Sequence, residues 1–185
     1  FDLETTGLDA SQDMILSLGG VDISCGKIDL KTGVHEYVNG HQEIKAESAV
    51  INHILPKMLE EGKQLDEVMD LLFHKMLGKV VLVHGKVVEK SFLDHYVNTH
   101  YQLPFLPVVW IDTLCIEKHL TYQQSDGGHD YQLDSLRHKY HLPKYPAHNA
   151  LIDSIACGEL FMAQLSHIFK ADKPKVTVGD VYIGK

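Results

Sequence analysis

The order of the apolar segments along the chain is the feature that most restricts the folds open to it. Three segments near the N-terminus have the composition of β-strands: Phe1–Glu4, Met14–Ile23 and Val34–Val38. Asp9–Asp13 is typical of a turn that pairs the first two, and Gly26 and Thr32-Gly33 mark the turn before the third. We therefore expect a small antiparallel sheet at the start of the fold.

Helices and strands alternate over the rest of the chain. Apolar spacing and helix-ending residues predict these helices: Ser48 to Gly62 with a restart at Pro56, Leu65 to Met76, Val88 to Tyr101, Gln132 to His141, and Asn149 to Phe169. Short apolar runs predict buried strands at Val80–Val83 and Val108–Ile111. This order predicts a single α/β domain with a mixed sheet. We assign it residues 1–169, expect its first strand to begin upstream of Phe1, and assign no structure to the tail at 170–185.

Length and composition agree with one globular domain and exclude several classes of protein. The chain has 185 residues, enough to bury a core, and no apolar run near the roughly 20 residues that a membrane span requires. Three widely spaced cysteines, Cys25, Cys115 and Cys157, are typical of reduced side chains in a cytoplasmic protein. The net charge of −8 argues against a protein that coats long duplexes, but it allows an enzyme that grips a strand end.

The segment Asp2-Leu3-Glu4-Thr5-Thr6-Gly7-Leu8 is the strongest local signal of chemistry. Residues two apart in a strand point to one face, so Asp2 and Glu4 present their carboxylates side by side. Such a pair repels unless a cation lies between its members, and a hard divalent ion is the usual solution. The alternative is two ordinary acids on a solvated edge strand, which the following Thr-Thr-Gly-Leu disfavours.

A second signal, Asp153, lies in the first turn of the last predicted helix. It precedes Ala156 and Cys157 by three and four residues, so it belongs to the apolar stripe that faces the core. A buried acid is costly unless it is paired or binds metal. The helix dipole also favours an acid in a first turn, but it does not explain an inward-facing one. His148, just before this helix, is by itself an ordinary loop histidine, one of 13 in the chain.

A further acid has to be chosen between Glu89 and Asp94, which follow the strand at Val80–Val83. Glu89 shares a helix face with apolar and aromatic residues at helical spacing: Phe92, Leu93, Tyr96 and Val97. Asp94 aligns instead with polar residues of the opposite face. We therefore expect Glu89 to point into the interior.

These three segments resemble the motifs of the DEDDh-type 3′→5′ exonucleases. Each segment supplies an inward acid, and a histidine precedes the acid of the last segment. This family includes RNase T and the proofreading subunits of bacterial polymerase III. FDLETTGL is similar to the first motif of the family, His84–Glu89 to the second, and HNALID to the third. Two positions depart from the pattern, because Glu89 replaces the usual Asp and Gly85 replaces the usual Asn. The resemblance implies a ribonuclease H-like fold, a mixed β-sheet flanked by helices.

The resemblance also implies a mechanism. Asp2, Glu4, Glu89 and Asp153 would hold two Mg²⁺ or Mn²⁺ ions about 3.5–4 Å apart at the scissile phosphate. His148 would take the proton from the attacking water, a role suited to a group that titrates near neutrality. The expected activity is removal of nucleoside 5′-monophosphates from the 3′ end of a single-stranded nucleic acid, with DNA favoured.

By the same resemblance, substrate binding is assigned to five residues: Thr5, Thr6, Gly7, Leu8 and His84. Leu8 would wedge against the terminal base. One alternative is a ribonuclease or oligonucleotide-degrading enzyme of the same fold, since no residue senses the 2′-hydroxyl. Another is a weakly active module that binds a polymerase, which the departures at Glu89 and Gly85 would favour. No feature of the sequence predicts an oligomeric state.

Overall fold

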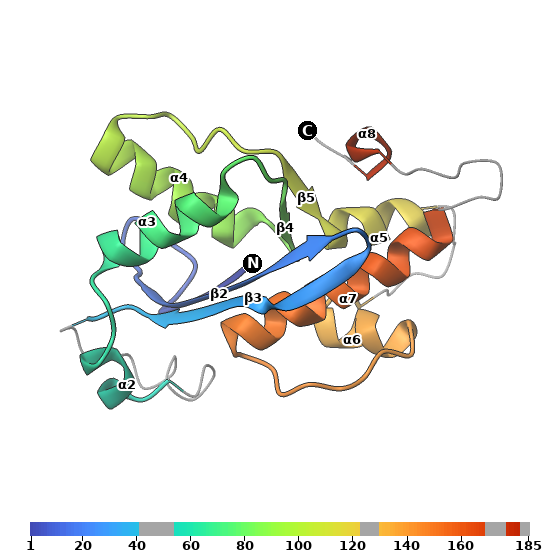
Figure 1. Ribbon diagram of the computed structural model, residues 1–185, viewed down its shortest axis with the longest axis horizontal. Coiled ribbons are helices and arrows are strands. Elements are labelled where there is room, and N and C mark those ends of the chain that lie inside the picture. Colours follow the sequence, from blue (N-terminus) through green and yellow to red (C-terminus); the bar gives the residue numbers. More distant parts are fainter. Residues whose placement is uncertain (41–53, 123–129, 169–176, 182–185) are drawn as a thin grey trace.

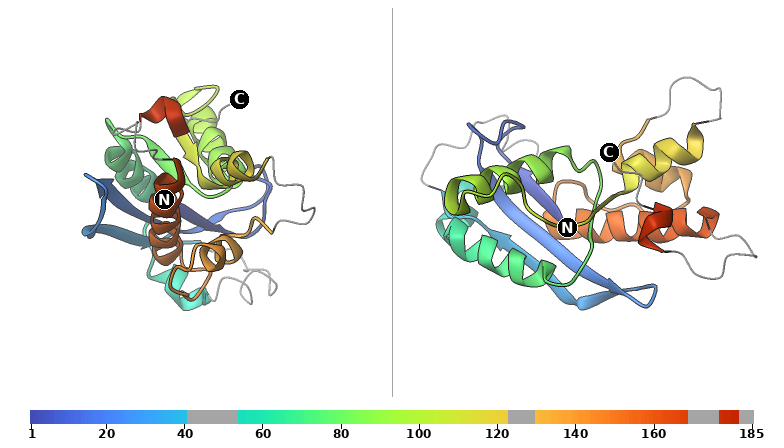
Figure 2. Two further views of the ribbon diagram at one scale, coloured as in Figure 1. Left: turned by 90° about the vertical axis from the view of Figure 1, so that its right-hand side faces the viewer. Right: turned by 90° about the horizontal axis from the view of Figure 1, so that it is seen from above.

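The computed structural model describes residues 1–40, 54–122, 130–168 and 177–181, which form one α/β domain (Figure 1). The strands lie between two groups of helices, with α3 and α4 on one side and α7 on the other (Figures 1 and 2). The first part of the helix predicted from Ser48 lies outside the described residues. Its second part is helix α2, which begins at Pro56 as expected and ends at Glu60, just before Gly62.

The first three strands form the expected antiparallel sheet. Strand β1 (Asp2–Thr5) pairs with β2 (Ile15–Ser24), and β2 pairs with β3 (Lys27–Tyr37). The predicted turn is confirmed at Gly26, but its extension to Thr32-Gly33 is wrong, because the third strand begins at Lys27 rather than Val34. Thr32 and Gly33 form an irregularity in which the Thr32 hydroxyl accepts the backbone N–H of Asp22 at 2.9 Å. A side chain thus replaces the backbone partner and lets the strand continue.

The remaining strands are parallel. Strand β4 (Val81–Val83) pairs with β5 (Trp110–Asp112). The amino group of Phe1 donates a hydrogen bond to the carbonyl oxygen of Leu82 at 2.8 Å, so β1 lies beside β4. The strands thus form a three-stranded antiparallel sheet and a two-stranded parallel sheet, which meet at β1 and β4, where the order of elements predicts a single mixed sheet.

Seven helices lie within the described residues: α2 (Pro56–Glu60), α3 (Leu65–Met76), α4 (Val87–Tyr101), α5 (Thr113–Thr121), α6 (Leu133–Lys139), α7 (Ala150–Ile168) and α8 (Val178–Val181). The apolar spacing predicts all of them except α5 and α8. Helix α5 follows β5 without a loop, and the Asp112 side chain caps it by accepting the N–H of Leu114 at 3.0 Å. None of the described helices has the length and apolarity to cross a membrane.

The tail contributes one short helix. Val181, in α8, is 3% exposed and packs with Ile111 of β5 and Ile116 of α5. Part of the segment to which the sequence assigns no structure therefore contacts the domain.

One face of β1 and β2 packs against α3 and α4. Leu3 and Leu18 pair across the two strands and join a core with apolar residues of both helices: Val68, Met69 and Leu72 of α3, and Phe92, Leu93, Tyr96 and Val97 of α4. Side chains alternate across a strand, so Asp2 and Glu4 point to the opposite face, where α7 lies. The core of the fold thus determines which face receives the acids.

Gly19 allows α7 to lie directly on β2. A Cβ atom at this position would lie 2.0 Å from the carbonyl carbon of Ala150 and 2.1 Å from the nitrogen of Leu151. The Ser154 hydroxyl oxygen lies 2.9 Å from the carbonyl oxygen of Gly19, to which it donates. Because Gly19 also pairs with Asp2 across the strands, this contact brings the first turn of α7 beside the acids of β1.

We predict that Gly19→Ala lowers the free energy of unfolding by about 1–3 kcal/mol, since the added methyl group overlaps helix backbone. The matched control is Gly20→Ala, whose Cβ would meet Phe1 Cβ at 3.5 Å, an ordinary contact. The control should change stability by no more than about 0.5 kcal/mol. Urea denaturation measures both, and equal effects of the two substitutions would contradict this role of Gly19.

Candidate active site

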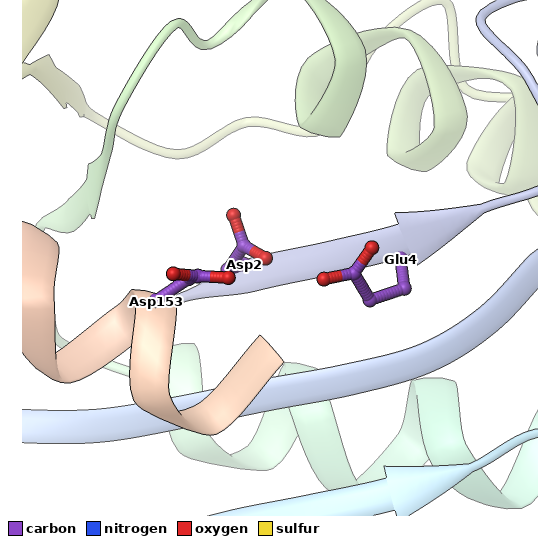
Figure 3. A group of neighbouring side chains, drawn as sticks. All are labelled: Asp2, Glu4 and Asp153. Atoms are coloured by element: carbon purple, nitrogen blue, oxygen red, sulfur yellow. The ribbon is translucent and has the colours of Figure 1, made fainter. Parts of the chain in front are cut away.

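Three carboxylates meet where β1 passes the first turn of α7 (Figure 3). Asp2 and Glu4 come from β1 and Asp153 comes from α7. Each offers one oxygen atom, and these atoms all lie within 4.8 Å of one another. The structure therefore brings together two acids that the strand pattern pairs and one that is about 150 residues away in the sequence.

Glu89 approaches from the first turn of α4. Its side chain is 5% exposed, and the carboxylate oxygen Oε2 is buried without a hydrogen-bond partner. The predicted inward orientation of Glu89 is thus confirmed, and so is the burial of its four helical neighbours. Asp94 instead faces Lys90, with which it forms an ion pair.

Burial and repulsion raise the pKa values of these acids. Burial raises the pKa of Glu4 to about 7, with the charges of Asp153 and Glu89 adding to the shift. Burial also raises the pKa of Glu89 to about 7. The pKa of Asp2 lies well above its ordinary value, first through burial and then through the charges of Glu89, Glu4 and Asp153. Four acids in this arrangement cannot all ionise near neutral pH unless a cation compensates them.

These residues fit a divalent metal ion. Hard cations such as Mg²⁺ prefer carboxylate oxygens, and the cluster of three offers them at close range. The unpartnered oxygen of Glu89 is a further donor, and a buried polar atom without a partner is costly unless a ligand satisfies it.

The start of α7 orients Asp153. The Asn149 side chain caps the helix by accepting the N–H of Ile152 at 3.1 Å, and the Asp153 carboxylate accepts the N–H of Asn149 at 3.0 Å. Burial raises the pKa of Asp153, and hydrogen bonds from the backbone of Asn149 and His148 partly offset this effect. His148 is exposed and has a φ of 65°, a left-handed conformation that few residues adopt. The predicted histidine is therefore next to Asp153, at the solvent side of the site.

The predicted substrate-binding residues after Glu4 lie in a compact loop. Asp13 organises this loop, because its carboxylate accepts the Thr6 hydroxyl and the N–H of Asp9, each at 3.0 Å. Gly7 packs so closely that a Cβ atom there would lie 2.3 Å from Asp13 Oδ2. The Thr5 hydroxyl donates to the carbonyl oxygen of Gly7 at 2.6 Å. Leu8 projects from the loop, 77% exposed.

His84 uses both ring nitrogens within the protein. Nδ1 lies 2.8 Å from the Thr113 hydroxyl, and Nε2 lies 2.9 Å from the carbonyl oxygen of Tyr131. Burial lowers the pKa of this imidazole. The structure therefore does not direct the nitrogens of His84 to the carboxylates.

Asp112 positions the turn that leads to Glu89. Its carboxylate accepts the N–H of Gly85 at 2.8 Å and that of Lys86 at 3.1 Å, in addition to capping α5. Gly85 has a φ of 80°, which suits glycine and explains its presence in this turn. Asp112 and Asp13 are not among the predicted site residues. An Asp that ends a strand and begins a helix is a capping signal that could have revealed Asp112.

Comparison with known proteins agrees with this geometry. The family model named Exonuclease, RNase_T, matches residues 1–161. The PolC-type DNA polymerase III of Thermotoga petrophila is 29% identical over 161 residues, a match that covers 87% of this chain and 11% of that protein. The DNA polymerase III subunit epsilon of Treponema pallidum is 27% identical over 167 residues, which are 90% of this chain and 75% of that protein. The chain thus spans only a small part of the length of its PolC-type relatives.

Solved structures support the ribonuclease H-like fold. Exonuclease X in complex with 5′ overhanging duplex DNA superposes with a TM-score of 0.68 at 21% identity, over 92% of this chain and 93% of that chain. The nuclease domain of 3′hExo, a DEDDh family member bound to rAMP, gives a TM-score of 0.69 at 17% identity, over 90% of each chain.

The family model covers most of the chain, and the acids of the first and third motifs form one cluster with the buried acid of the second beside them. The chain therefore belongs to the exonuclease family that the RNase_T model describes.

Proposed function

We propose that this enzyme removes nucleotides one at a time from the 3′ end of a single-stranded nucleic acid, with DNA favoured, and releases nucleoside 5′-monophosphates. The observation that carries the proposal is the convergence of Asp2, Glu4 and Asp153 within 4.8 Å, beside the buried Glu89. A phosphodiester has no affinity for such an anionic site without bound cations, so the site requires metal.

We assign two Mg²⁺ or Mn²⁺ ions to Asp2, Glu4, Glu89 and Asp153. Bound ions supply the positive charge that stabilises an attacking hydroxide and a leaving 3′ oxygen. The chain itself supplies the remaining functions. His148, exposed beside Asp153, accepts the proton of the attacking water.

The loop after β1 holds the terminal nucleotide in this proposal. Backbone groups of Thr5, Thr6 and Gly7 contact it, and the exposed Leu8 packs against its base. Substrate contact by His84 stays a prediction, and it would involve the ring carbons because both nitrogens are engaged.

Two alternatives have specific support. A ribonuclease of the same fold is one, since 3′hExo was solved with rAMP while Exonuclease X was solved with DNA. A module associated with a polymerase is the other, since the curated relatives are a PolC-type polymerase and an epsilon subunit.

The three free cysteines favour a reducing compartment such as the cytoplasm.

Digestion of 3′- and 5′-labelled DNA and RNA oligonucleotides tests the proposal. We expect stepwise loss from the 3′ end with Mg²⁺ or Mn²⁺, abolished by EDTA. Asp2→Asn should lower the rate by at least about 100-fold, since it removes a metal ligand and even indirect partners of metal sites cost roughly 10–100-fold. Asp70→Asn, an exposed change on α3, is the control and should keep full activity. Absence of cleavage by the folded wild-type protein on every substrate would refute the exonuclease proposal.

Glu89→Gln tests whether Glu89, which replaces the usual Asp of the family, is a metal ligand. The amide keeps the shape of the side chain but loses its charge, so we expect at least about a 10-fold loss of rate and weaker Mn²⁺ binding. Glu89→Asp should keep metal-dependent activity, because it restores the usual acid of the family. Wild-type activity of Glu89→Gln would exclude this role.

The raised pKa values predict a pH-dependent stability of the metal-free protein. Glu89 binds its proton more tightly when folded, with a pKa of about 7, than when unfolded, so its stabilising effect is present below about pH 4.5 and is lost as pH rises through about 7. In EDTA, Glu89→Gln should therefore exceed wild type in free energy of unfolding at pH 8, with a much smaller difference at pH 5. Denaturation at both pH values measures this, and an equal difference at pH 5 and pH 8 would contradict it.

A further inference from the structure

The segment between Asp134 and Asp153 has a different charge from the rest of the chain. It contains no acid, whereas the whole chain has a net charge of −8. It contains three basic residues and three histidines: Arg137, Lys139 and Lys144, and His138, His141 and His148. This segment comprises α6, the α6–α7 loop (Tyr140–Asn149) and the start of α7, and it leads directly to the site (Figure 1).

Only one of the three basic side chains is available to a ligand. Arg137 is 3% exposed and pairs with Glu159 at 2.8 Å. Lys139 pairs with the buried Glu117 at 2.7 Å. Lys144 is exposed and forms no ion pair with any described residue. His138 and His141, on the same segment, are also exposed.

The α6–α7 loop is held in one conformation by Arg137. Its guanidinium donates to the carbonyl oxygen of Pro143 at 2.6 Å and to that of Ala156 in α7 at 2.8 Å. The Tyr145 ring lies under the guanidinium at 4.6 Å, and its hydroxyl donates to Glu159 at 3.0 Å. Pro143 is thus held by Arg137 and Tyr145 by Glu159 of α7, so Lys144 between them projects from an anchored backbone. An anchored cation loses less entropy when it binds than one on a free loop.

The loop places Lys144 within reach of a strand that leaves the active site. Lys144 precedes His148 by four residues, which span at most about 14 Å. Glu159, which anchors Tyr145, lies about 9 Å along the axis of α7 from Asp153, at 1.5 Å per residue. A few nucleotides cover such distances.

We propose that the α6–α7 loop binds the phosphate backbone of the substrate on the 5′ side of the scissile bond, with Lys144 as the phosphate ligand. This proposal rests on the proposed exonuclease function. The negative charge of the chain repels a polyanion, and a cation beside the site offsets that repulsion for the phosphates that do not contact metal. Tyr145 and Arg137 are positioning residues that act through the loop.

Lys144→Ala tests the role of the loop on two single-stranded substrates, a 12-mer and a dinucleotide. Both are made of whichever nucleic acid, DNA or RNA, the wild-type enzyme prefers. The dinucleotide fills only the catalytic site, whereas the 12-mer extends past the loop. We expect the KM of the 12-mer to rise roughly three- to tenfold with kcat unchanged, and the dinucleotide to be hydrolysed as by wild type. The dependence of log KM on log salt concentration should weaken by about 0.7, the effect of one lost phosphate contact on a single strand.

Two further variants serve as controls. Lys144→Arg should restore wild-type behaviour, because it keeps the charge. Lys27→Ala removes another exposed lysine, at the tip of the β2–β3 hairpin and about 17 Å along the strand from the Gly19 pair of Asp2, and should change neither KM nor the salt dependence. Equal effects of Lys27→Ala and Lys144→Ala would overturn the proposal, as would an equal loss on the dinucleotide and the 12-mer.

Binding of a fluorescent 12-mer, measured by anisotropy in Ca²⁺, separates this proposal from the proposed function. If wild type hydrolyses neither substrate, the exonuclease proposal fails, while a weaker affinity of Lys144→Ala than of Lys27→Ala would still support the loop. If wild type hydrolyses both and the affinities of the two variants are equal, the loop proposal alone fails.

Discussion

The contact between Gly19 and the first turn of α7 is the constraint on which the site depends. Only a residue without a side chain lets helix backbone approach β2 this closely, because a Cβ atom would lie 2.0 Å from Ala150. Gly19 pairs with Asp2, so the same contact brings Asp153 to the acids of β1. The apolar face of β1 and β2, packed on α3 and α4, decides that Asp2 and Glu4 point toward α7. A packing requirement thus determines the position of every carboxylate in the cluster.

This packing creates an electrostatic conflict within the fold. Burial raises the pKa of both Glu4 and Glu89 to about 7, and repulsion from neighbouring acids adds to the shift for Glu4. The metal-free protein therefore pays in stability for each of these acids that ionises, as is common for functional sites. Divalent ions convert the same repulsion into affinity, since they require the ionised forms. Bound cations relieve this destabilisation while the acids stay ionised.

Much of this arrangement follows from local patterns in the sequence. The DxE spacing on β1, the stripe of Glu89 on α4 and the stripe of Asp153 on α7 each depend on the period of one element, and all three orientations are as expected. The prediction of a turn at Thr32-Gly33 was wrong because the Thr32 hydroxyl accepts the backbone N–H of Asp22 on the neighbouring strand. No local pattern reveals this hydrogen bond. Asp13 and Arg137 likewise organise loops through hydrogen bonds, from Asp9 and to Pro143, that no sequence pattern indicates. Asp112 differs from them, because an Asp between a strand and a helix is a capping signal that the sequence does carry.

The clustered acids are proposed to form a metal site whose affinity depends on their ionisation. Calorimetric titration of the EDTA-treated wild-type protein with Mn²⁺, at several values between pH 5.5 and 8.5 and in buffers of different ionisation enthalpy, tests it most directly. We expect two ions per chain, release of protons on binding at lower pH, and an affinity that rises steeply until the pH exceeds about 7 and then levels off. Binding that is absent, or that shows the same affinity and no proton release across this range, would contradict a metal site at these acids.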